Sequence, residues 1–508
     1  MMSEHLLTFL IFLPVGAALV LLAIPSKYRS FYRWIALGAS IVQLLLLFAI
    51  VGRYDPAGGL QFTERVPWID FVFKAQYFVA IDGLSFPLVM LAVFVLLIAV
   101  ISSWNVTDRS KGYFALLLIL NGAVIGSFCA LDLLLFYLFF EFMLLPMYFL
   151  IGIWGGPNRE YASIKFFLYT LLGSILILLV IIGLYVSAGS FAIPGMYDNV
   201  TIGSIFSTTQ NYLILGWPAR NWAFVFLLIG FGIKLPMVPL HTWLPDAHVE
   251  ASTPISVILA ALLLKIGGYG LLRVAYPIFP DAAVAMSTVV AFLGMLSIVY
   301  GAMNALASKD FKRLIAYSSV SHMGFILLGL ASVTIEGTTG AVFQMTSHGL
   351  ISSMLFLIAG VLYDRTHDRT IANYSGLASK MPVYTAFVLV AFFATLGLPG
   401  LSGFIGEIMV FLGAFSYGFV PTWIAVVSVT GLIFAAGYCL WTVQRMFFGP
   451  FAVKGDFTMN DVTAREKLML LPLSILIMSM GIFPQLLIRY IDPFSTQLVQ
   501  FIMDTVTN

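Results

Sequence analysis

Charged residues are scarce in this sequence: Asp, Glu, Lys and Arg make up 9% of its 508 residues, and hydrophobic residues make up 61%. Soluble domains carry about 25% charged residues, which cover their surface in water. With so few charges and a mean hydropathy of +1.02, a chain of this size must expose most of its surface to lipid. The net charge of +2 and the lack of a basic cluster argue against nucleic acid or an anionic lipid patch as a partner.

Cysteine is also scarce. Cys129 and Cys439 both lie within apolar runs and form no CxxC or other metal-ligand spacing. This argues against iron–sulfur, haem c and zinc sites, and no glycine-rich nucleotide loop is present. The first apolar run, about 6–24, has no basic segment before it, so no cleavable signal peptide is expected. We expect no cofactor and no metal in this chain.

Long apolar runs, in contrast, are frequent. A bilayer core of about 30 Å needs about 20 helical residues. The sequence therefore predicts an all-α polytopic membrane protein with about 14 transmembrane helices. In chain order, these predicted spans lie at 5–24, 32–51, 82–102, 113–131, 133–154, 164–187, 222–242, 255–273, 282–303, 313–332, 339–363, 382–413, 422–445 and 468–488. The twelfth is too long for one straight span and contains Leu398-Pro399-Gly400, so we expect a broken helix there.

The distribution of basic residues predicts the orientation. If the N-terminus is outside, most of the 25 lysines and arginines fall in inner loops, among them Lys165, Lys312 and Arg369. The outer loops then hold only Arg53, Arg65, Lys74, Arg220, Arg273 and Arg489. Inner loops of membrane proteins carry an excess of Lys and Arg. We therefore predict that both termini lie on the outer, periplasmic side.

Two predicted spans are interrupted by glycine and proline. The sequence GIKLPMVP at 232–239 breaks the seventh span, and GLPGLSG at 397–403 breaks the twelfth. Paired breaks of this kind, here five spans apart, are typical of repeats of inverted topology in transporters. A weaker similarity joins the segments 165–185 and 343–363. These features predict two inverted five-helix repeats.

The predicted organisation has four parts and no soluble domain. They are N-terminal helices at 1–112, a first repeat (spans 4–8) at 113–280, a second, inverted repeat (spans 9–13) at 281–450 and a C-terminal helix at 451–508. The longest polar stretches are interpreted as loops, at 52–81, 188–221 and 446–467.

Four charged residues lie inside predicted spans, where each costs at least about 2.5 kcal/mol to insert. They are Glu141, Lys234, Lys265 and Glu407. Three histidines lie in or beside spans as well, His241, His322 and His348, and His248 falls in a predicted inner loop where it is expected to be solvated. A lone lysine can extend its charge to the membrane surface, and Glu141 with Lys234 can form a purely structural pair. So many polar groups over seven spans, two beside helix breaks, favour a functional role.

These residue types suit proton transfer. Burial and ion pairing shift the proton affinity of lysine and glutamate in opposite directions, so a pair that separates and re-forms can bind and release a proton. A broken helix admits water, and a histidine can pass a proton between its two ring nitrogens. Hydroxyls such as those of Ser318, Ser321 and Ser347 could extend the path, or could serve only as hydrogen bonds between helices.

The run KLPMVPLHTWLPDAHVEASTPISVILAALLLK from Lys234 to Lys265 closely resembles the antiporter-like subunits of respiratory complex I and their relatives in multisubunit Na⁺/H⁺ antiporters and membrane hydrogenases. So do FYLFFEFMLLPMYFLIG around Glu141, SKDFKRLIAYSSVSHMG, TSHGLISSMLFL and LPGLSGFIGE. Together these motifs cover nearly the whole chain. A glutamate at Glu407 and the lack of a long lateral helix resemble the M-type member of this family, where the L-type and N-type members usually have lysine.

The resemblance implies a set of roles. Glu141 and Lys234 form the coupled pair, Lys265 is the central lysine, His322 and His348 continue the polar axis, and Glu407 feeds the outer exit. His241 and His248 are weaker candidates. The resemblance also implies a bacterial inner membrane, lipids and L-type and N-type subunits as neighbours, and FMN, iron–sulfur clusters and quinone bound by other subunits.

Three functions remain open from the sequence. The chain can be a proton-pumping subunit of complex I, or a subunit of an Na⁺/H⁺ antiporter or ion-pumping hydrogenase, whose buried residues would be similar. It can also be a scaffold in which the buried charges are structural pairs. Replacement of Glu141 or Lys234 separates the scaffold from the other two.

Overall fold

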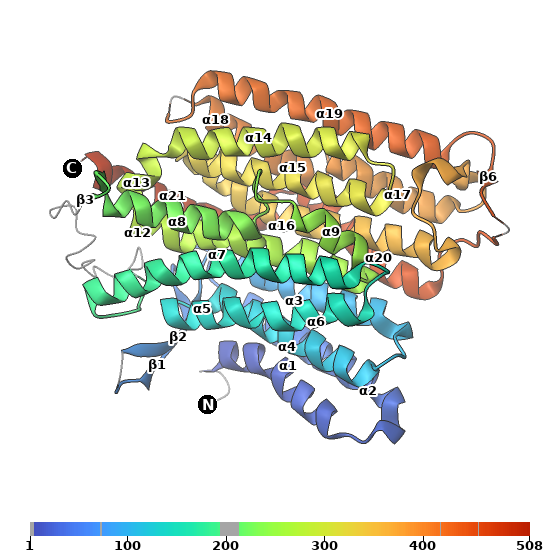
Figure 1. Ribbon diagram of the computed structural model, residues 1–508, viewed down its shortest axis with the longest axis horizontal. Helices are drawn as coiled ribbons and strands as arrows, with labels where there is room; N and C mark the ends of the chain where they lie inside the picture. The colour runs from blue at the N-terminus through green and yellow to red at the C-terminus, as the bar shows by residue number, and fades with distance from the viewer. Residues whose placement is uncertain (1–4, 72–73, 194–212, 417, 456, 508) are drawn as a thin grey trace.

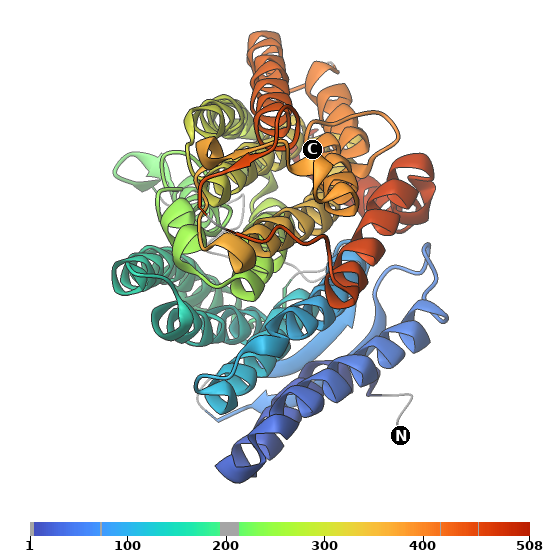
Figure 2. The ribbon, with the colours of Figure 1, turned by 90° about the vertical axis from the view of Figure 1, so that its right-hand side faces the viewer.

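The computed structural model describes residues 5–71, 74–193, 213–416, 418–455 and 457–507. Most of the helices run along one axis of the molecule, as Figure 1 shows. In the end-on view of Figure 2, α1 (Leu6–Ala23) and α2 (Tyr32–Val51) lie along one edge of the bundle. The chain is therefore a helical bundle of the kind expected for a polytopic membrane protein.

Within the described residues, eleven helical segments are long and apolar enough to cross a membrane. Besides α1 and the segment ending with α2, they include α3 (Ser85–Ser102), α4 (Ser110–Cys129), α5 (Leu133–Phe142) with α6 (Leu144–Trp154), α7 (Arg159–Ala188), α14 (Ser287–Ala307), α15 (Phe311–Ser332), α16 (Ile335–Thr366) and α19 (Thr422–Phe447). The remaining one, Thr253–Ile278, is made of α10 (Thr253–Ile258), η3 (Leu259–Leu263), α11 (Leu264–Gly270), η4 (Leu271–Ala275) and α12 (Tyr276–Ile278), of which η3 and η4 are π-helical.

The other helices are shorter or bent. They are α8 (Ala219–Lys234), α9 (Trp243–Glu250), α13 (Pro280–Ala285), α17 (Pro382–Thr395), α18 (Ser402–Phe415), α20 (Ala464–Ile482) and α21 (Gln485–Thr507), with the 3₁₀ turns η1 (Ser26–Phe31), η2 (Ser103–Asn105), η5 (Ile371–Asn373) and η6 (Leu377–Ser379). α20 and α21 meet at a bend of 65°. Counted as one span, this pair raises the number of candidate crossings in the described chain to twelve.

The difference from the expected fourteen spans has a local cause. The expected spans at 222–242 and 382–413 coincide with α8–α9 and α17–α18, which are broken, so no single helix there is long enough to cross. The segment 451–508, expected to hold one helix, also contains α21. That helix has apolar residues on one face only, so its sequence does not read as a membrane span.

The interpretation of 52–81 as a loop is wrong in part. Two antiparallel strands form there, β1 (Gln61–Ile69) and β2 (Ala75–Ile81), with Arg65 opposite Phe78. The Glu64 carboxylate from β1 accepts a hydrogen bond of 2.9 Å from the amide of Leu7 in the first turn of α1, so the hairpin is fixed to that helix. Smaller antiparallel pairs join β3 (Leu213–Ile214) to β4 (Trp217–Pro218) and β5 (Tyr374–Ser375) to β6 (Ala452–Val453). Residues 194–212 of the predicted loop 188–221 lie outside the described residues.

Burial separates the central helices from the outer ones. The most apolar windows of Thr253–Ile278 and α16 are fully buried by other parts of the chain, and that of α15 is 94% buried, whereas α1, α7 and α19 are 39% buried. The outer helices therefore present apolar side chains to lipid or to another subunit. Charges on the central helices are shielded from both lipid and bulk water, and the predicted site residues Lys265, His322 and His348 lie on these helices.

Candidate functional site

The break between α8 and α9 places Lys234 at the last residue of a helix. The chain then leaves the helix, and its free backbone groups find new partners. The indole of Trp243 donates to the carbonyl of Ile233 (2.9 Å), and the amide of Val238 donates to Ser297 Oγ (3.0 Å). Because buried backbone groups must be paired, these bonds let the helix end inside the protein.

Lys234 is buried and lies against α5. Its Nζ donates to the carbonyl of Phe140 (3.1 Å) and lies 3.2 Å from the centroid of the Phe140 ring. The next residue is Glu141, whose charge acts on Lys234 although no ion pair within 4.0 Å joins the two in the described chain. The Glu141 Oε2 atom is buried and has no hydrogen-bond partner there. The sequence predicts that Glu141 and Lys234 form a pair. The structure places Lys234 against Phe140, the residue before Glu141, and shows no ion pair between the two charged groups among the described residues.

The second break lies between α17 and α18 and positions Glu407. Gly397 has a positive φ of +75°, and a Cβ at this residue would lie 2.3 Å from Glu407 Oε2. Only glycine accepts both the backbone conformation and the approach of the carboxylate. Ser347 on α16 donates to Ser402 Oγ at the start of α18 (2.8 Å), which attaches the broken helix to the centre of the bundle.

Four of the predicted residues form one continuous line across the bundle. Lys265 Nζ lies 2.7 Å from His348 Nδ1, and the rings of His348 and His322 have centroids 5.3 Å apart. His322 Nδ1 lies 3.5 Å from Glu407 Oε1. The line runs from α11 through α16 and α15 to α18, and each of these residues is at most 5% exposed.

The π-helical segment η3 shapes the environment of Lys265. The Lys265 side chain donates to the carbonyl of Ala260, five residues earlier, at 2.6 Å. Wide helical turns of this kind leave backbone carbonyls available and are frequent at functional sites. Lys265 therefore has a backbone acceptor on its own helix as well as the His348 ring, so its ammonium has two partners.

The two halves of the site meet where α8 packs on α11. A Cβ at Gly267 would lie 2.6 Å from both the amide of Leu235 and the carbonyl of Phe231. This close approach puts the end of α8, which carries Lys234, directly beside the helix that carries Lys265. The structure thus brings six predicted residues into two adjacent groups, Glu141 with Lys234 and Lys265 with His348, His322 and Glu407.

His241 and His248 lie outside these groups. His241 packs against Tyr300, with centroids 5.2 Å apart. The expectation that His248 is solvated in a loop is wrong, because it lies in α9, is 0% exposed and stacks on Phe356 at 4.4 Å. The segment was expected to be a loop because it lies between two predicted spans, but packing against α7 and α15 stabilises a short helix. Both ring nitrogens of His248 are buried without a hydrogen-bond partner among the described residues.

The sequence analysis missed Gln344. It lies on α16 with its Nε2 atom 3.2 Å from His322 Nδ1, and it is buried. It stands four residues before His348, and residues at this spacing share a helix face. This i, i+4 relation to a selected histidine was the signal that could have found it.

Two basic residues assigned to loops are in fact buried in helices. Arg273, expected in an outer loop, lies in η4 and pairs with Asp82 at 2.6 Å. Burial alone would raise the pKa of the Asp82 carboxyl, but the charge and hydrogen bond of Arg273 and bonds from Ser85 lower the pKa overall. Lys312, expected in an inner loop, is 6% exposed in the first turn of α15. Its neighbour Asp310 caps that helix and marks its start, which places Lys312 inside it.

Most buried hydroxyls in the centre serve the helices themselves. Ser318 and Ser319 both donate to the carbonyl of Ile315 on their own helix. Ser321 instead donates to Ile298 on α14 (2.8 Å), and Ser347 reaches α18. The interpretation as hydrogen bonds between helices therefore fits Ser321 and Ser347, whereas Ser318 and Ser319 bond within α15. Among the described residues, no group of three His, Cys, Asp or Glu side chains could hold a metal ion.

Comparisons with known proteins place the chain among membrane subunits of respiratory complexes. Residues 130–434 match the family described as NADH:quinone oxidoreductase/Mrp antiporter, transmembrane. The chain is 43% identical to the NADH-quinone oxidoreductase subunit M of Rhodobacter capsulatus, over 98% of this chain and 97% of that relative.

Solved structures show the same likeness. A chain of respiratory complex I from Thermus thermophilus with bound NADH superimposes with a TM-score of 0.85 at 30% identity, covering 98% of this chain and 99% of that one. A chain of the membrane-bound sulfane sulfur reductase, an archaeal respiratory membrane complex, gives a TM-score of 0.81 at 25% identity, covering 95% and 77%.

Proposed function

Because this chain belongs to the family of transmembrane subunits shared by NADH:quinone oxidoreductase and Mrp antiporters, we propose that it translocates protons as the M-type subunit in the membrane arm of a respiratory complex I. The observation that carries this proposal is the buried line Lys265–His348–His322–Glu407. Four titratable groups in contact across the centre of a lipid-facing bundle cost free energy that packing alone does not require.

The line supports a stepwise transfer. The Lys265 ammonium gives a proton to His348 Nδ1, and His348 releases its other ring proton toward His322 Nε2, which is buried and unpartnered in the described chain. His322 then releases the Nδ1 proton to Glu407 Oε1, and the carboxyl passes it to the outer side. This transfer leaves Lys265 as a neutral amine that takes up the next proton, and it restores the charge of both histidines and of Glu407. Each histidine is left in its other tautomer until ring rotation or proton exchange resets it. Water between the two imidazole rings completes the path.

Glu141 and Lys234 act as the coupled pair at the other end. When the Lys234 ammonium moves toward the Glu141 carboxylate, a positive charge leaves the neighbourhood of Lys265 and proton binding there becomes more favourable. When it returns to the Phe140 carbonyl, the Lys265 proton is repelled along the line. His241 and His248 are auxiliary members of the path.

We further propose fourteen crossings arranged as two inverted repeats, 113–280 and 281–450, after N-terminal helices at 1–112 and before the C-terminal part 451–508. One local motif supports the repeat. Asp132 caps α5 and its segment forms an antiparallel bridge with Ala192, while Asp310 caps α15 and bridges in the same way to Thr370. In both bridges, the two paired residues are separated by the same number of positions in the sequence.

The positions of these two motifs support opposite orientations. Asp132 accepts a hydrogen bond from the amide of Gln76 in β2 (3.1 Å), and the Thr370 bridge is followed directly by η5 and β5, which pairs with β6. Figure 1 shows β2 and β6 at opposite ends of the bundle. The same motif at opposite ends is what an inverted repeat produces.

The chain ends lie toward the end of the bundle that carries β1 to β4 (Figure 1), which fits an even number of crossings. We propose that this end faces the periplasm of a bacterial inner membrane, because most of the loop lysines and arginines belong to the other end. L-type and N-type subunits and lipids then cover the apolar faces of the outer helices. FMN, iron–sulfur clusters and quinone belong to other subunits of the complex.

The test uses inner-membrane vesicles with the complete complex and follows NADH-driven proton uptake. Glu141→Gln and Lys234→Ala should assemble normally while uptake and the coupled rate of NADH oxidation fall strongly. Normal uptake in an assembled Lys234→Ala complex contradicts the relay and leaves the scaffold function.

The likeness to the archaeal sulfur reductase complex keeps a second candidate, a subunit of an Na⁺/H⁺ antiporter or of another ion-pumping complex. Carboxylate and carbonyl oxygens such as those of Glu407 and its broken helix can bind Na⁺ as well as protons. Uptake that depends on added Na⁺ would favour this candidate, and uptake that is unchanged without Na⁺ favours the proton relay.

A further inference from the structure

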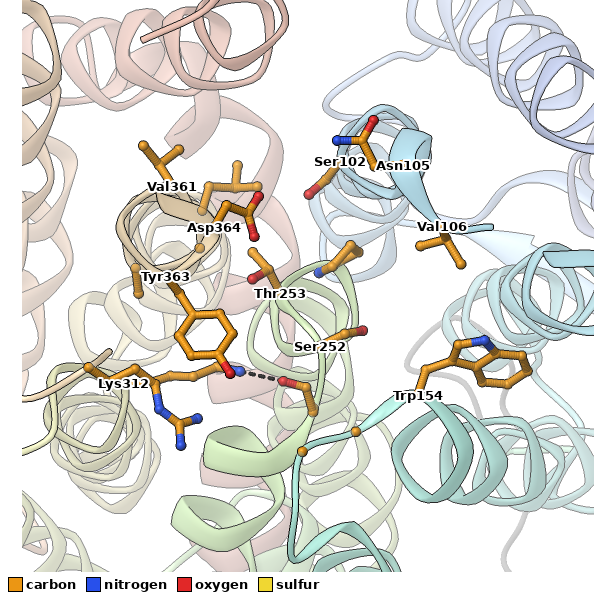
Figure 3. A pocket seen from close by; sticks show the side chains of 18 of the residues that line it. Ser102, Asn105, Val106, Trp154, Ser252, Thr253, Lys312, Val361, Tyr363 and Asp364 are labelled. Carbon is orange, nitrogen blue, oxygen red and sulfur yellow. Dashed lines mark hydrogen bonds between the residues drawn. The ribbon is translucent and has the colours of Figure 1, made fainter. Parts of the chain in front are cut away.

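A cavity of about 380 Å³ opens at the end of the bundle opposite the chain termini. Figure 3 shows it between the ends of α3, α10 and α16, with the side chains of Ser102, Thr253 and Asp364 directed toward it. At about 30 Å³ per water molecule, it can hold roughly ten waters. Its wall also contains charged residues of both signs, Glu250, Arg369 and Arg465 among them. A cavity with such a wall is filled with water.

Lys312 is the buried cation of this wall. Its Nζ donates to the carbonyl of Ala251, the C-cap residue of α9, as the dashed line in Figure 3 shows. No ion pair within 4.0 Å involves Lys312 in the described part of the chain, although the charges of Arg369, Asp310 and Glu250 all act on it, the first of the same sign and the other two of opposite sign. A buried lysine with only a backbone acceptor and cavity water for partners is free to exchange a proton with that water.

α9 connects this cavity to the central residues. His248 and Ala251 stand three residues apart at the end of this helix, so they lie one above the other on one face. The ammonium of Lys312, bound to the Ala251 carbonyl, is therefore close to the His248 ring. The charges of Lys312 and Lys265 both act on that ring. Because its two nitrogens lack protein partners among the described residues, water must reach them.

α16 provides the second connection. His248 stacks on Phe356, and the next residue, Leu357, and Gly360 one turn further line the cavity. In the other direction, His348 lies eight residues before Phe356, which is about 12 Å along the helix axis. Lys265 contacts His348 at one end of this stretch and His248 stacks on Phe356 at the other, so bridging water would be needed to join them. The cavity, His248 and Lys265 thus form one path into the bundle.

We propose that this cavity is the proton-uptake vestibule of the subunit and that Lys312 is the first titratable residue of the path. The Lys312 ammonium gives a proton through cavity water to one nitrogen of His248, and the resulting neutral amine takes a new proton from the inner solution. His248 releases the proton of its other ring nitrogen through water to the neutral amine of Lys265. Lys312 and Lys265 are then ammonium groups, and His248 is neutral in its other tautomer until ring rotation or proton exchange resets it. This inference rests on the proposed proton translocation.

The test compares three substitutions at Lys312 in inner-membrane vesicles with the complete complex. Lys312→Met removes the titratable group. Lys312→Arg keeps the positive charge but cannot release a proton, and Lys312→His can bind and release one. We expect Met and Arg to lower NADH-driven proton uptake several-fold at normal assembly, and His to restore part of it. Lys309→Met, an exposed lysine three residues earlier, is the matched control and should leave uptake unchanged.

Two outcomes overturn the inference. If Lys312→Arg supports full uptake, Lys312 is a fixed cation, and if Lys312→Met does so, the residue is not on the path. If the methionine variant fails to assemble, the comparison of Arg with His still decides. Lys265→Ala separates this inference from the function on which it rests. Lost uptake in Lys265→Ala with normal uptake in Lys312→Met rejects the vestibule alone, whereas normal uptake in Lys265→Ala rejects the relay itself.

Discussion

The two broken helices place charges of opposite sign on opposite sides of the break. Lys234 is the last residue of α8, where the partial negative charge of a helix C-terminus favours a cation. Glu407 follows its break in the second turn of α18, nearer to a helix N-terminus, which favours an anion. Lys234 binds a backbone carbonyl, while Glu407 faces His322. The polarity of each helix end thus matches the charge it holds.

This difference between the two breaks indicates which of the two charged residues tolerates substitution. At the first break the ammonium donates to the Phe140 carbonyl and lies at a helix C-terminus, and an anion can neither donate this bond nor be stabilised there. At the second break the carboxylate has a titratable partner and a glycine that leaves room for it. We therefore expect the first position to be strict in charge and the second to be more tolerant.

The largest expected effect is a charge reversal at the first break. Lys234→Glu would put a carboxylate against the Phe140 carbonyl and the C-terminus of α8, and should slow proton uptake by at least roughly tenfold, which corresponds to a barrier higher by about 1.4 kcal/mol. Glu407→Lys should keep clearly more uptake. The measurement is NADH-driven uptake per amount of assembled complex. Equal losses in the two variants would remove the distinction between the breaks.

A second, smaller effect is expected at Gly397. Gly397→Ala forces a side chain into a left-handed conformation, at about 1–2 kcal/mol, and also pushes its Cβ toward Glu407. Gly400→Ala is the matched control, because Gly400 has a φ of +92° but nothing within 4 Å of its Cβ position. Both variants should lower the midpoint of thermal unfolding, and only Gly397→Ala should also lower proton uptake several-fold. The same uptake in both variants would show that backbone strain alone matters.

The positions of the two helix breaks and of the charged residues beside them can be predicted from the sequence. Gly and Pro interrupt a helix locally, and a charged residue among apolar ones is recognisable without a structure. It was not sufficient for contacts between helices. That Lys265 meets His348 and that His322 meets Glu407 depends on how α11, α15, α16 and α18 pack. The sequence predicts loop positions for Lys312 and Arg273, because a basic residue near a helix end is expected to be solvated. The sequence does not show that another helix covers it.

Two further elements were missed for different reasons. The first strand of the hairpin β1–β2 mixes polar and apolar residues and is mostly exposed, so a search for long apolar runs passes over it. α21 buries residues such as Leu487, Ile491 and Leu498 on one face, at helical spacing. Its exposed face is polar, so a criterion based on mean hydropathy does not select it.

The two capping motifs, at Asp132 on α5 and at Asp310 on α15, can be compared in the same way as the two breaks. Asp132→Ala and Asp310→Ala each remove a helix N-cap, at about 0.5–2 kcal/mol. Asp132 also accepts from Gln76, and Asp310 pairs with Arg369 at 3.3 Å, so the losses in unfolding free energy should be similar. Thermal unfolding of the purified complex measures them. A loss confined to one variant would contradict the structural equivalence of the two motifs.

The smallest effects on proton uptake are expected from the hydroxyls that attach each broken helix to the bundle, because their replacement lowers stability and leaves the titratable groups in place. Ser297→Ala leaves the buried amide of Val238 without its acceptor, which costs about 1–3 kcal/mol. Ser347→Ala removes only the bond that Ser347 donates to Ser402 Oγ, and the Ser402 hydroxyl keeps its own proton to donate elsewhere, so about 0.5–1.5 kcal/mol is expected. Both variants should assemble, and the unfolding midpoint should fall further for Ser297→Ala. The opposite order would mean that the second break, not the first, depends on its attachment to the bundle, and that the tolerance expected at Glu407 has another origin.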